Sequence, residues 1–224
     1  PRRMSSQLYT NTNGRLAVVM VGLPGTGKTF TARNLSRSLR WLGVRTRTFS
    51  VASYRRSYLL EQGDVVSATA DFFDPTHMGC LRVRTEIAEK ALGELLAWLG
   101  GDGGGQVAIL DGSNTIQARR DTIEQKLRAN KVQCVFLECI YKDQSEHFEG
   151  HVEELLLTCP EYAGWPTERA ITDYLLRIQH YTLNYQPLTA NPPTCGFLQL
   201  VNGGEQLIVE RVNGFLCSRI TYYL

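Results

Sequence analysis

Short apolar runs alternate with amphipathic stretches along most of the chain. Leu16–Val21 is continuously apolar, as expected for a strand that is buried on both faces of a parallel sheet. In the next stretch, apolar residues recur at steps of three, four and three from Ala32 to Leu42, which is the spacing of one helix face. Gly43 follows where a helix would end. The order of strand, loop and helix predicts an α/β unit.

The same alternation continues to the end of the chain. We predict further strands over 44–51, 107–110, 132–140, 197–201 and 206–209, and further helices over 78–99, 116–130, 145–157, 167–185 and from about Val212. The last two strands flank Asn202-Gly203-Gly204, a turn signal that predicts a hairpin. The pattern therefore predicts an α/β fold of three layers, with a mainly parallel central sheet and a C-terminal hairpin.

Length and composition suit one globular domain. The chain has 224 residues, of which 43% are hydrophobic and 21% charged, and this composition excludes a chain that is disordered throughout. Residues 1–15 are polar and are predicted to form a flexible N-terminal segment. Residues 16–224 contain no internal repeat and are predicted to form a single domain.

Charge and cysteine content narrow the expected partners and compartment. A formal net charge of +2 gives no strongly basic surface, so no nucleic-acid partner is expected. Lysine accounts for five of the 24 basic residues and arginine for 19, and arginine is the side chain that grips phosphate through two hydrogen bonds. The six cysteines include no Cys-x-x-Cys pair, and no apolar run approaches the roughly 20 residues that span a bilayer. We expect free thiols, no membrane partner and a cytoplasmic location.

The strongest motif is Gly22-Leu23-Pro24-Gly25-Thr26-Gly27-Lys28-Thr29, between the first predicted strand and helix. A Gly-x-x-x-x-Gly-Lys-Ser/Thr sequence in this context is typical of the phosphate-binding loop, or P-loop, of nucleotide-binding proteins. Lys28 is expected to reach the β and γ phosphates and Thr29 to hold Mg²⁺. The motif thus predicts ATP and Mg²⁺ as cofactors, with binding residues Gly22, Gly25, Thr26, Gly27, Lys28 and Thr29.

Asp111 ends the apolar run 107–110 and so occupies the Walker-B position, where a carboxylate holds magnesium directly or through water. A lone aspartate after a strand can also cap a helix, but the P-loop in the same chain favours the metal role. We predict Thr29 and Asp111 as metal ligands, and Lys28 and Asp111 as catalytic residues. Phosphoryl transfer depends mainly on positioning and charge stabilisation, so no covalent nucleophile is needed.

Arginines occur in pairs near the ends of predicted strands. Ligands of open α/β sheets bind at the edge formed by the carboxyl ends of the strands. One solvated pair on a helix needs no function, but several pairs together indicate an acceptor that already carries phosphate. The pairs are Arg55-Arg56, Arg82 with Arg84, and Arg119-Arg120.

In order and spacing, these motifs resemble the kinase domain of the bifunctional 6-phosphofructo-2-kinase/fructose-2,6-bisphosphatases. The resemblance covers nearly the whole chain from Arg15. Beyond the P-loop it runs through Trp41-Leu42-Gly43-Val44, Ser53-Tyr54-Arg55-Arg56, Phe72-Phe73, Arg82-Val83-Arg84, Asp111-Gly112-Ser113-Asn114-Thr115, Arg119-Arg120, Cys159-Pro160-Glu161-Tyr162, Arg177-Ile178 with Tyr181, and Ser218-Arg219-Ile220-Thr221-Tyr222-Tyr223-Leu224.

The resemblance implies transfer of the ATP γ-phosphoryl group to the 2-hydroxyl of fructose 6-phosphate, which gives the glycolytic regulator fructose 2,6-bisphosphate. It implies that Asp111 is the catalytic aspartate. The residues implied to hold the sugar phosphate are Arg55, Arg84, Ser113, Arg119, Arg177 and Tyr181. A homodimer is left open. Because no Arg-His-Gly phosphohistidine motif occurs, we expect a monofunctional kinase or a kinase domain separated from a phosphatase domain.

Three positions depart from the family pattern. Leu156 stands where the family has a lysine that helps to neutralise the transferring phosphate, Tyr141 replaces a family cysteine, and Thr26 replaces an arginine of the P-loop. A hydrophobic side chain cannot replace a positive charge. Two alternatives therefore stay open: a catalytically weak nucleotide-binding regulatory module, and a P-loop kinase for another small acceptor.

Overall fold

The helices and strands follow the predicted alternation closely. The computed structural model describes residues 14–61, 69–101, 104–142, 152, 155–156, 159–188 and 195–224. The elements are β1 (Leu16–Val21), α1 (Lys28–Trp41), β2 (Thr46–Ser50), α2 (Val51–Glu61), η2 (Ala70–Phe73), α3 (Met78–Gly100), β3 (Val107–Asp111), α4 (Gln117–Ala129), β4 (Gln133–Ile140), η3 (Pro160–Tyr162), α6 (Thr167–Thr182), β5 (Gly196–Val201), η4 (Asn202–Gly204), β6 (Gln206–Glu210) and α7 (Phe215–Tyr223). Nearly all of the predicted segment 1–15 and most of the predicted helix 145–157 lie outside the described residues.

Six strands form one sheet in the order β2-β3-β1-β4-β5-β6. The first five strands are parallel, with Leu16 of β1 in register with Val107 of β3 on one side and Gln133 of β4 on the other. Only β6 runs antiparallel, and it pairs with β5. The predicted fold class, a mainly parallel sheet that ends in a C-terminal hairpin, is confirmed.

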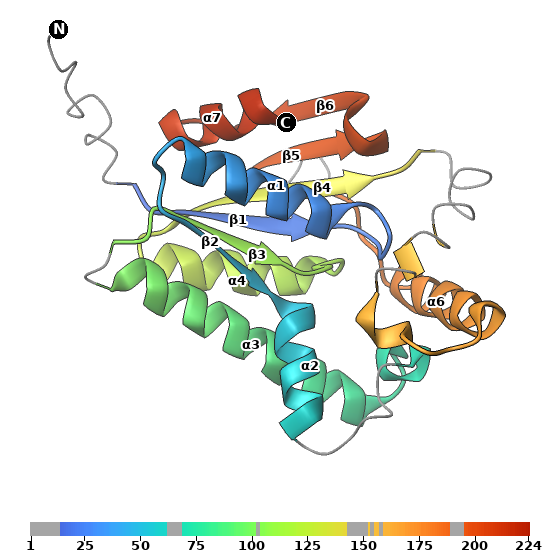
Figure 1. The fold of residues 1–224 in the computed structure, drawn as a ribbon. Helices are drawn as coiled ribbons and strands as arrows, with labels where there is room; N and C mark the ends of the chain where they lie inside the picture. Colours follow the sequence, from blue (N-terminus) through green and yellow to red (C-terminus); the bar gives the residue numbers. More distant parts are fainter. Residues whose placement is uncertain are drawn as a thin grey trace, which may run out of the picture.

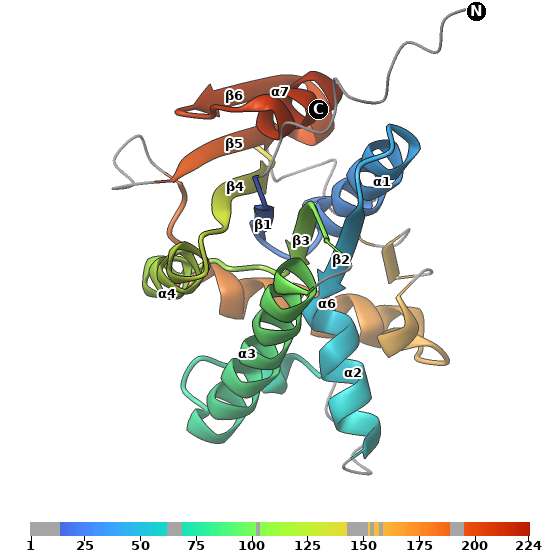
Figure 2. The same ribbon diagram turned by 90° about the vertical axis from the view of Figure 1, so that its left-hand side faces the viewer.

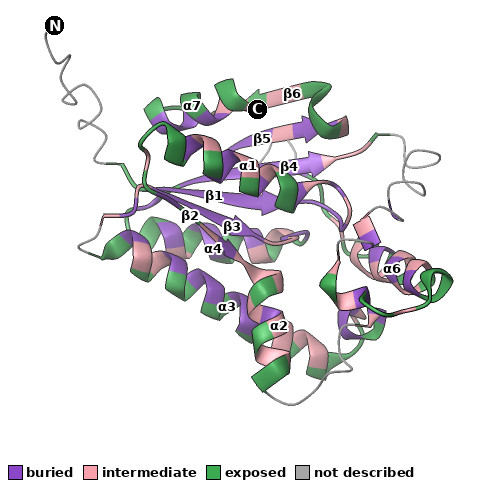
Figure 3. Cartoon of the chain, viewed as in Figure 1, coloured by how far each residue is buried: buried purple, intermediate pink, exposed green. Residues whose placement is uncertain are grey.

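Helices cover both faces of the sheet and make three layers. Figure 1 shows α1 and α7 on one face and α3 and α4 on the other, and Figure 2 shows the same layers from the side. Alternate residues of β1 enter the two cores, so that Val18 packs with the α1 side and Val19 with the α3 side. Figure 3 shows that the central strands are buried along their length, which explains their continuous apolar sequence.

Helix α2 was not predicted, because it lacks the apolar stripe of an amphipathic helix. Its only buried residue is Arg55. It begins directly where β2 ends, so the predicted strand 44–51 was too long at both ends. A helix whose inward face carries a charged side chain is defined by its tertiary partners and not by a local period.

The predicted end of helix α6 and the predicted start of helix α7 were also wrong, because residues next to each helix decide where it stops or begins. Helix α6 ends at Thr182 and not at Tyr185. The backbone N–H of Gln186 instead donates to the carbonyl oxygen of Thr115, 2.9 Å away. Helix α7 begins at Phe215 and not near Val212, because Gly214 precedes it with a φ of 100°.

The P-loop begins at a close approach between two chain segments. Gly22 has a φ of 134°, and a Cβ at this position would collide with the carbonyl oxygen of Cys139 at the end of β4. Its backbone N–H donates to the carbonyl oxygen of Ser113, 2.9 Å away, after β3. Only glycine allows the loop to pass between these neighbours.

We therefore expect Gly22→Ala to lower the free energy of unfolding by about 1–3 kcal/mol, because the added methyl group strains the backbone and displaces β4. The matched control is Gly93→Ala in α3, where an added Cβ would meet no other atom within 4 Å. This exposed helical position should gain about 0.5–1 kcal/mol. Chemical denaturation of both variants measures the two effects, and equal stability of Gly22→Ala and the wild type would contradict the close approach.

Candidate active site

The P-loop of the structure joins β1 to the N-terminus of α1. Three of its glycines have positive φ angles: Gly22, Gly25 and Gly27 at 134°, 83° and 78°. Gly27 precedes the first residue of α1 without a side-chain cap, and the first turn contains no acidic residue. The N–H groups and partial positive charge of this helix end are therefore free to receive an anion.

Lys28 is buried, and its ammonium group turns back onto its own loop. Its Nζ donates to the carbonyl oxygen of Leu23 and lies 3.4 Å from Oγ1 of Thr26. Burial lowers the pKa of Lys28 from 10.5 to about 8, although the negative charge of Asp111 opposes this. A phosphate that entered the loop would offer this charge a stronger partner than a carbonyl group.

Thr29 and Asp111 meet across the end of the sheet. The hydroxyl of Thr29 donates to both carboxylate oxygens of Asp111, at 3.0 and 3.2 Å. Both residues are oxygen donors, and oxygen is the ligand that Mg²⁺ prefers. The two predicted metal ligands thus lie close together, although they come from elements 82 residues apart.

The loop after β3 is held by a residue that the sequence did not single out for a role. Asn114 has a φ of 43°, which is uncommon for a residue with a side chain. Its amide nitrogen donates to the carbonyl oxygen of Met20 at 2.8 Å, and its amide oxygen accepts from Nε of Arg119 at 3.1 Å. Asn114 therefore links the loop to β1 and orients one of the predicted acceptor residues.

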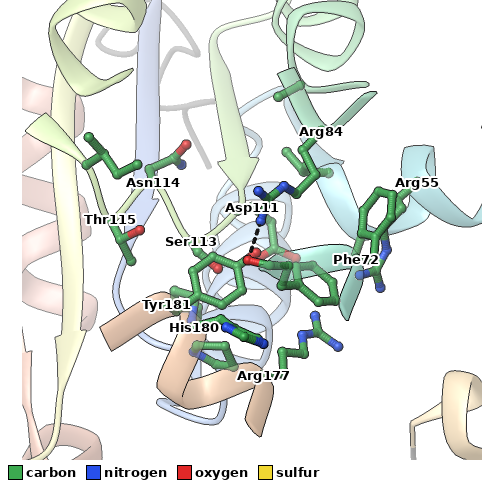
Figure 4. A pocket seen from close by; sticks show the side chains of 18 of the residues that line it. Arg55, Phe72, Arg84, Asp111, Ser113, Asn114, Thr115, Arg177, His180 and Tyr181 are labelled. Atoms are coloured by element: carbon green, nitrogen blue, oxygen red, sulfur yellow. Dashed lines mark hydrogen bonds between the residues drawn. The ribbon is translucent and has the colours of Figure 1, made fainter. Parts of the chain in front are cut away.

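One pocket of about 500 Å³ adjoins the P-loop at the carboxyl edge of the sheet. Figure 4 shows side chains entering it from three directions: Ser113 from the loop after β3, Arg55 and Arg84 from α2 and α3, and Arg177 and Tyr181 from α6. Its walls contain Gly25, Gly27, Lys28, Thr29 and Asp111, and all six predicted acceptor residues, Arg55, Arg84, Ser113, Arg119, Arg177 and Tyr181. Gly22 and Thr26 are buried and are not among the lining residues.

Glu161, another residue without a predicted role, joins two of the arginines. Its carboxylate accepts from Nη2 of Arg55 and from Nη1 of Arg177, the latter at 3.0 Å. Burial alone would raise the pKa of Glu161, but the charges of Arg55 and Arg177 outweigh it and lower that pKa to about 2. The guanidinium groups of Arg177 and Arg55 also lie 4.1 and 4.8 Å from the ring centroid of Phe73. No local pattern marks Glu161, because its partners lie on other elements.

The other two arginines have no carboxylate partner among the described residues. Arg84 donates to the carbonyl oxygens of Phe73 and Asp74 at 2.6 and 3.1 Å, and Arg119 donates to Asn114. Within the described part of the chain, four nitrogens of this pocket are buried without a hydrogen-bond partner: Nε of Arg55, Arg84 and Arg177, and Nε2 of His180. Unpaired buried donors are unfavourable unless a ligand satisfies them. The pocket wall is therefore suited to an anionic, oxygen-rich ligand.

Comparison with known proteins agrees with this geometry. The model of the 6-phosphofructo-2-kinase family matches residues 4–224. The chain belongs to the 6-phosphofructo-2-kinase family. Its relatives include the 6-phosphofructo-2-kinase/fructose-2,6-bisphosphatases of Caenorhabditis elegans, 34% identical over 92% of this chain and 45% of the relative, and of Gallus gallus, 33% identical over 100% and 46%. The predicted family is confirmed, and the chain spans less than half the length of these curated relatives.

Solved structures support the fold of this family member independently. The APS kinase CysC of Mycobacterium tuberculosis, in complex with AMPPNP and APS, has a TM-score of 0.53 at 13% identity. The match covers 94% of this chain and 95% of that one. Kti12 of Chaetomium thermophilum, in complex with ADP-AlF3, has a TM-score of 0.54 at 18% identity, over 92% and 96%. At these identities the likeness concerns the fold alone.

Two further observations concern membranes and metals. Among the described helices of this family member, none combines the length and hydrophobicity needed to cross a bilayer. In the same part of the chain, no group of three or more histidine, cysteine or acidic residues could hold a metal ion.

The lowered pKa of Lys28 predicts a dependence of stability on pH. Burial disfavours the charged form of Lys28, so this side chain destabilises the folded state in full below pH 8. The destabilisation is lost as pH rises from 8 to 10.5. The unfolding free energy of the wild type should therefore rise relative to that of Lys28→Met by up to about 1.4 kcal/mol per pH unit in this window. Denaturation of both proteins across the window measures this, and a constant difference would contradict the burial of the charge.

Proposed function

We propose that this chain transfers the γ-phosphoryl group of ATP to the 2-hydroxyl of fructose 6-phosphate, which gives fructose 2,6-bisphosphate. One observation carries the proposal: a single pocket runs from Lys28 and Asp111 to four arginines, three of which keep a buried Nε without a partner. Such a pocket suits a nucleotide at one end and an acceptor that already carries phosphate at the other. The family to which the chain belongs is named for this reaction.

On the nucleotide side, the backbone of the P-loop would surround the β and γ phosphates, and Lys28 would leave the carbonyl oxygen of Leu23 to contact them. Thr29 and Asp111 would hold Mg²⁺, which supplies positive charge to the phosphate oxygens. Lys28 would thus supply positive charge to the phosphates, and Asp111 would supply a carboxylate to the metal.

On the acceptor side, Arg84 and Arg119 would contribute positive charge, since neither forms an ion pair with a described carboxylate. Arg55 and Arg177 are held by Glu161 with their planar groups against Phe73, which fixes their direction before the sugar phosphate arrives. Ser113 and Tyr181 would add hydroxyl groups that can donate or accept hydrogen bonds with the sugar. Fixed donors of this kind recognise a phosphate dianion without a large reorganisation cost.

Leu156 supports a second candidate, a catalytically weak nucleotide-binding module. Its side chain is 9% exposed and packs in an apolar cluster with Tyr162, Tyr174 and Ile178. A positive charge at this position is therefore absent. The same nucleotide site could then bind ATP without rapid transfer.

An assay of ADP release tests the proposal against both alternatives. We expect ADP release that requires magnesium and increases with fructose 6-phosphate, together with an acid-labile sugar bisphosphate product. Asp111→Asn should fold but lose most of this activity, because one charge of the magnesium site is removed. ADP release that needs a nucleoside or a sugar acid would favour another acceptor, and ATP binding without acceptor dependence would favour the regulatory module.

Arg177→Ala should weaken the use of fructose 6-phosphate by about one to two orders of magnitude in kcat/KM, because charge-assisted contacts contribute roughly 1.5–3 kcal/mol. KM for ATP should stay close to that of the wild type. The matched control is Arg169→Ala on the same helix, since Arg169 is exposed and lies over Trp165 outside the pocket. An unchanged KM for fructose 6-phosphate, or a change in KM for ATP alone, would contradict the role of Arg177.

A further inference from the structure

Two charged residues are fully buried outside the pocket wall. Arg120 in α4 and Glu138 in β4 both have 0% exposure. Within the described part of the chain, neither forms a direct ion pair. A buried charge is costly unless hydrogen bonds or an opposite charge compensate it, so the partners of these two residues show what they hold in place.

Glu138 holds the chain that leaves α6. Its carboxylate accepts from the hydroxyl of Tyr185 at 2.6 Å, from the backbone N–H of Leu188 at 3.1 and 3.2 Å, and from Nε2 of Gln199 at 2.7 Å. Gln199 also donates to the carbonyl oxygen of Leu188 at 3.0 Å. Residues 185–188 are thereby fixed against β4 and β5, and they follow the helix that carries Arg177 and Tyr181.

Arg120 holds the loop that follows β3. Its Nη1 donates to the carbonyl oxygens of Asn114 and Thr115 at 3.1 and 3.0 Å, and its Nη2 donates to Oε1 of Gln117 at 2.6 Å. Figure 4 shows Asn114 and Thr115 on the side of the pocket opposite Arg55. The guanidinium group therefore fixes the backbone between Asp111 and the N-terminus of α4.

The two held segments bind each other directly. The N–H of Gln186 donates to the carbonyl oxygen of Thr115 at 2.9 Å, and the N–H of Gln117 donates to Oε1 of Gln186 at 2.6 Å. The carbonyl oxygen of Thr115 thus accepts from both Arg120 and Gln186. Burial lowers the pKa of Arg120, and the negative charge of Glu138 opposes that effect, so the two charges attract across the junction.

We infer that Glu138 and Arg120 are positioning residues that hold α6 and the loop after β3 at the separation that the acceptor needs. The inference rests on the proposed function for the identity of that acceptor. Through this junction, Arg177 and Tyr181 on one wall keep their distance from Ser113 and Arg119 on the other. Among the described residues, the P-loop contacts this loop through the N–H of Gly22, and Thr29 binds Asp111 at the end of β3. The nucleotide end is therefore held by β1 and β3 themselves and depends less on the junction.

Glu138→Gln tests this inference, because it removes the charge and keeps the shape. We expect kcat/KM for fructose 6-phosphate to fall by about 10²-fold, as a displacement of about 1 Å can cause, while KM for ATP is unchanged. The matched control is Glu124→Gln, the same chemical change in α4, where Glu124 is buried and pairs with Arg128 at 2.8 Å. It should leave both constants unchanged. Equal losses for both substrates, or no loss for the acceptor, would overturn the inference.

Tyr185→Phe is a milder variant for the case in which Glu138→Gln does not fold. It removes one hydroxyl that donates to Glu138 and keeps the ring. We expect KM for fructose 6-phosphate to rise roughly tenfold, with KM for ATP unchanged. A KM for fructose 6-phosphate equal to that of the wild type would overturn the role of this contact.

Hydrogen–deuterium exchange tests the junction without any substrate. Glu138→Gln, or Tyr185→Phe in its place, should speed exchange at the backbone amides of Gln117 and Gln186 and leave those of α1 unchanged. Unchanged exchange at Gln117 and Gln186 would overturn the inference. If the wild type does not act on fructose 6-phosphate but the variants show this faster exchange, the proposed function is contradicted and the positioning role remains supported.

Discussion

The concentration of positive charge in one partly buried pocket is the constraint that the rest of the site must satisfy. Among the described residues, five cationic side chains line it: Lys28, Arg55, Arg84, Arg119 and Arg177. Two like charges about 4 Å apart repel by about 4 kcal/mol at an effective dielectric constant of about 20. The fold keeps these groups together by giving Arg55 and Arg177 a shared carboxylate and by supporting Arg84 with carbonyl oxygens. The remaining excess of charge would attract a phosphate dianion, as the proposed function requires.

Sheet topology brings the compensating groups to the same place. Parallel strands end at one edge, so the P-loop after β1 and Asp111 at the end of β3 meet without a long loop. Helix α2 starts at Val51, directly after the last residue of β2, and this direct connection brings Arg55 to that edge. Glu161 then connects α2 to α6, which is distant in sequence. The order of strands in the sheet therefore determines which charges can meet.

What could be predicted depended on whether the signal was local. Some features have a signal within a few neighbouring residues: the buried strand before Gly22, the helix after Lys28, and Asp111 at a strand end. The structure has these features at the predicted positions. Helix α2 could not be found in this way, since its buried side chain is an arginine that needs Glu161. Residues distant from each other in the chain, such as Glu161 and Asn114, had no local signal of their role. The six acceptor residues came from the family resemblance, because arginine pairs alone are equally typical of solvated helices.

The departures from the family pattern are expected to affect the rate of phosphoryl transfer more than the binding of either substrate. A positive charge that contacts the transferring phosphoryl group is valuable mainly where negative charge redistributes, which is in the transition state. The family resemblance implies such a charge at the position of Leu156. Leu156 lies in an apolar cluster with residues of α6, and Arg177 keeps its ion pair with Glu161. Thr26, in turn, donates to the carbonyl oxygen of Leu23 at 2.9 Å and supports the loop from within. A slow kinase and a nucleotide-binding regulatory module thus differ in the rate of phosphoryl transfer. This difference is measured by kcat and not by KM for either substrate.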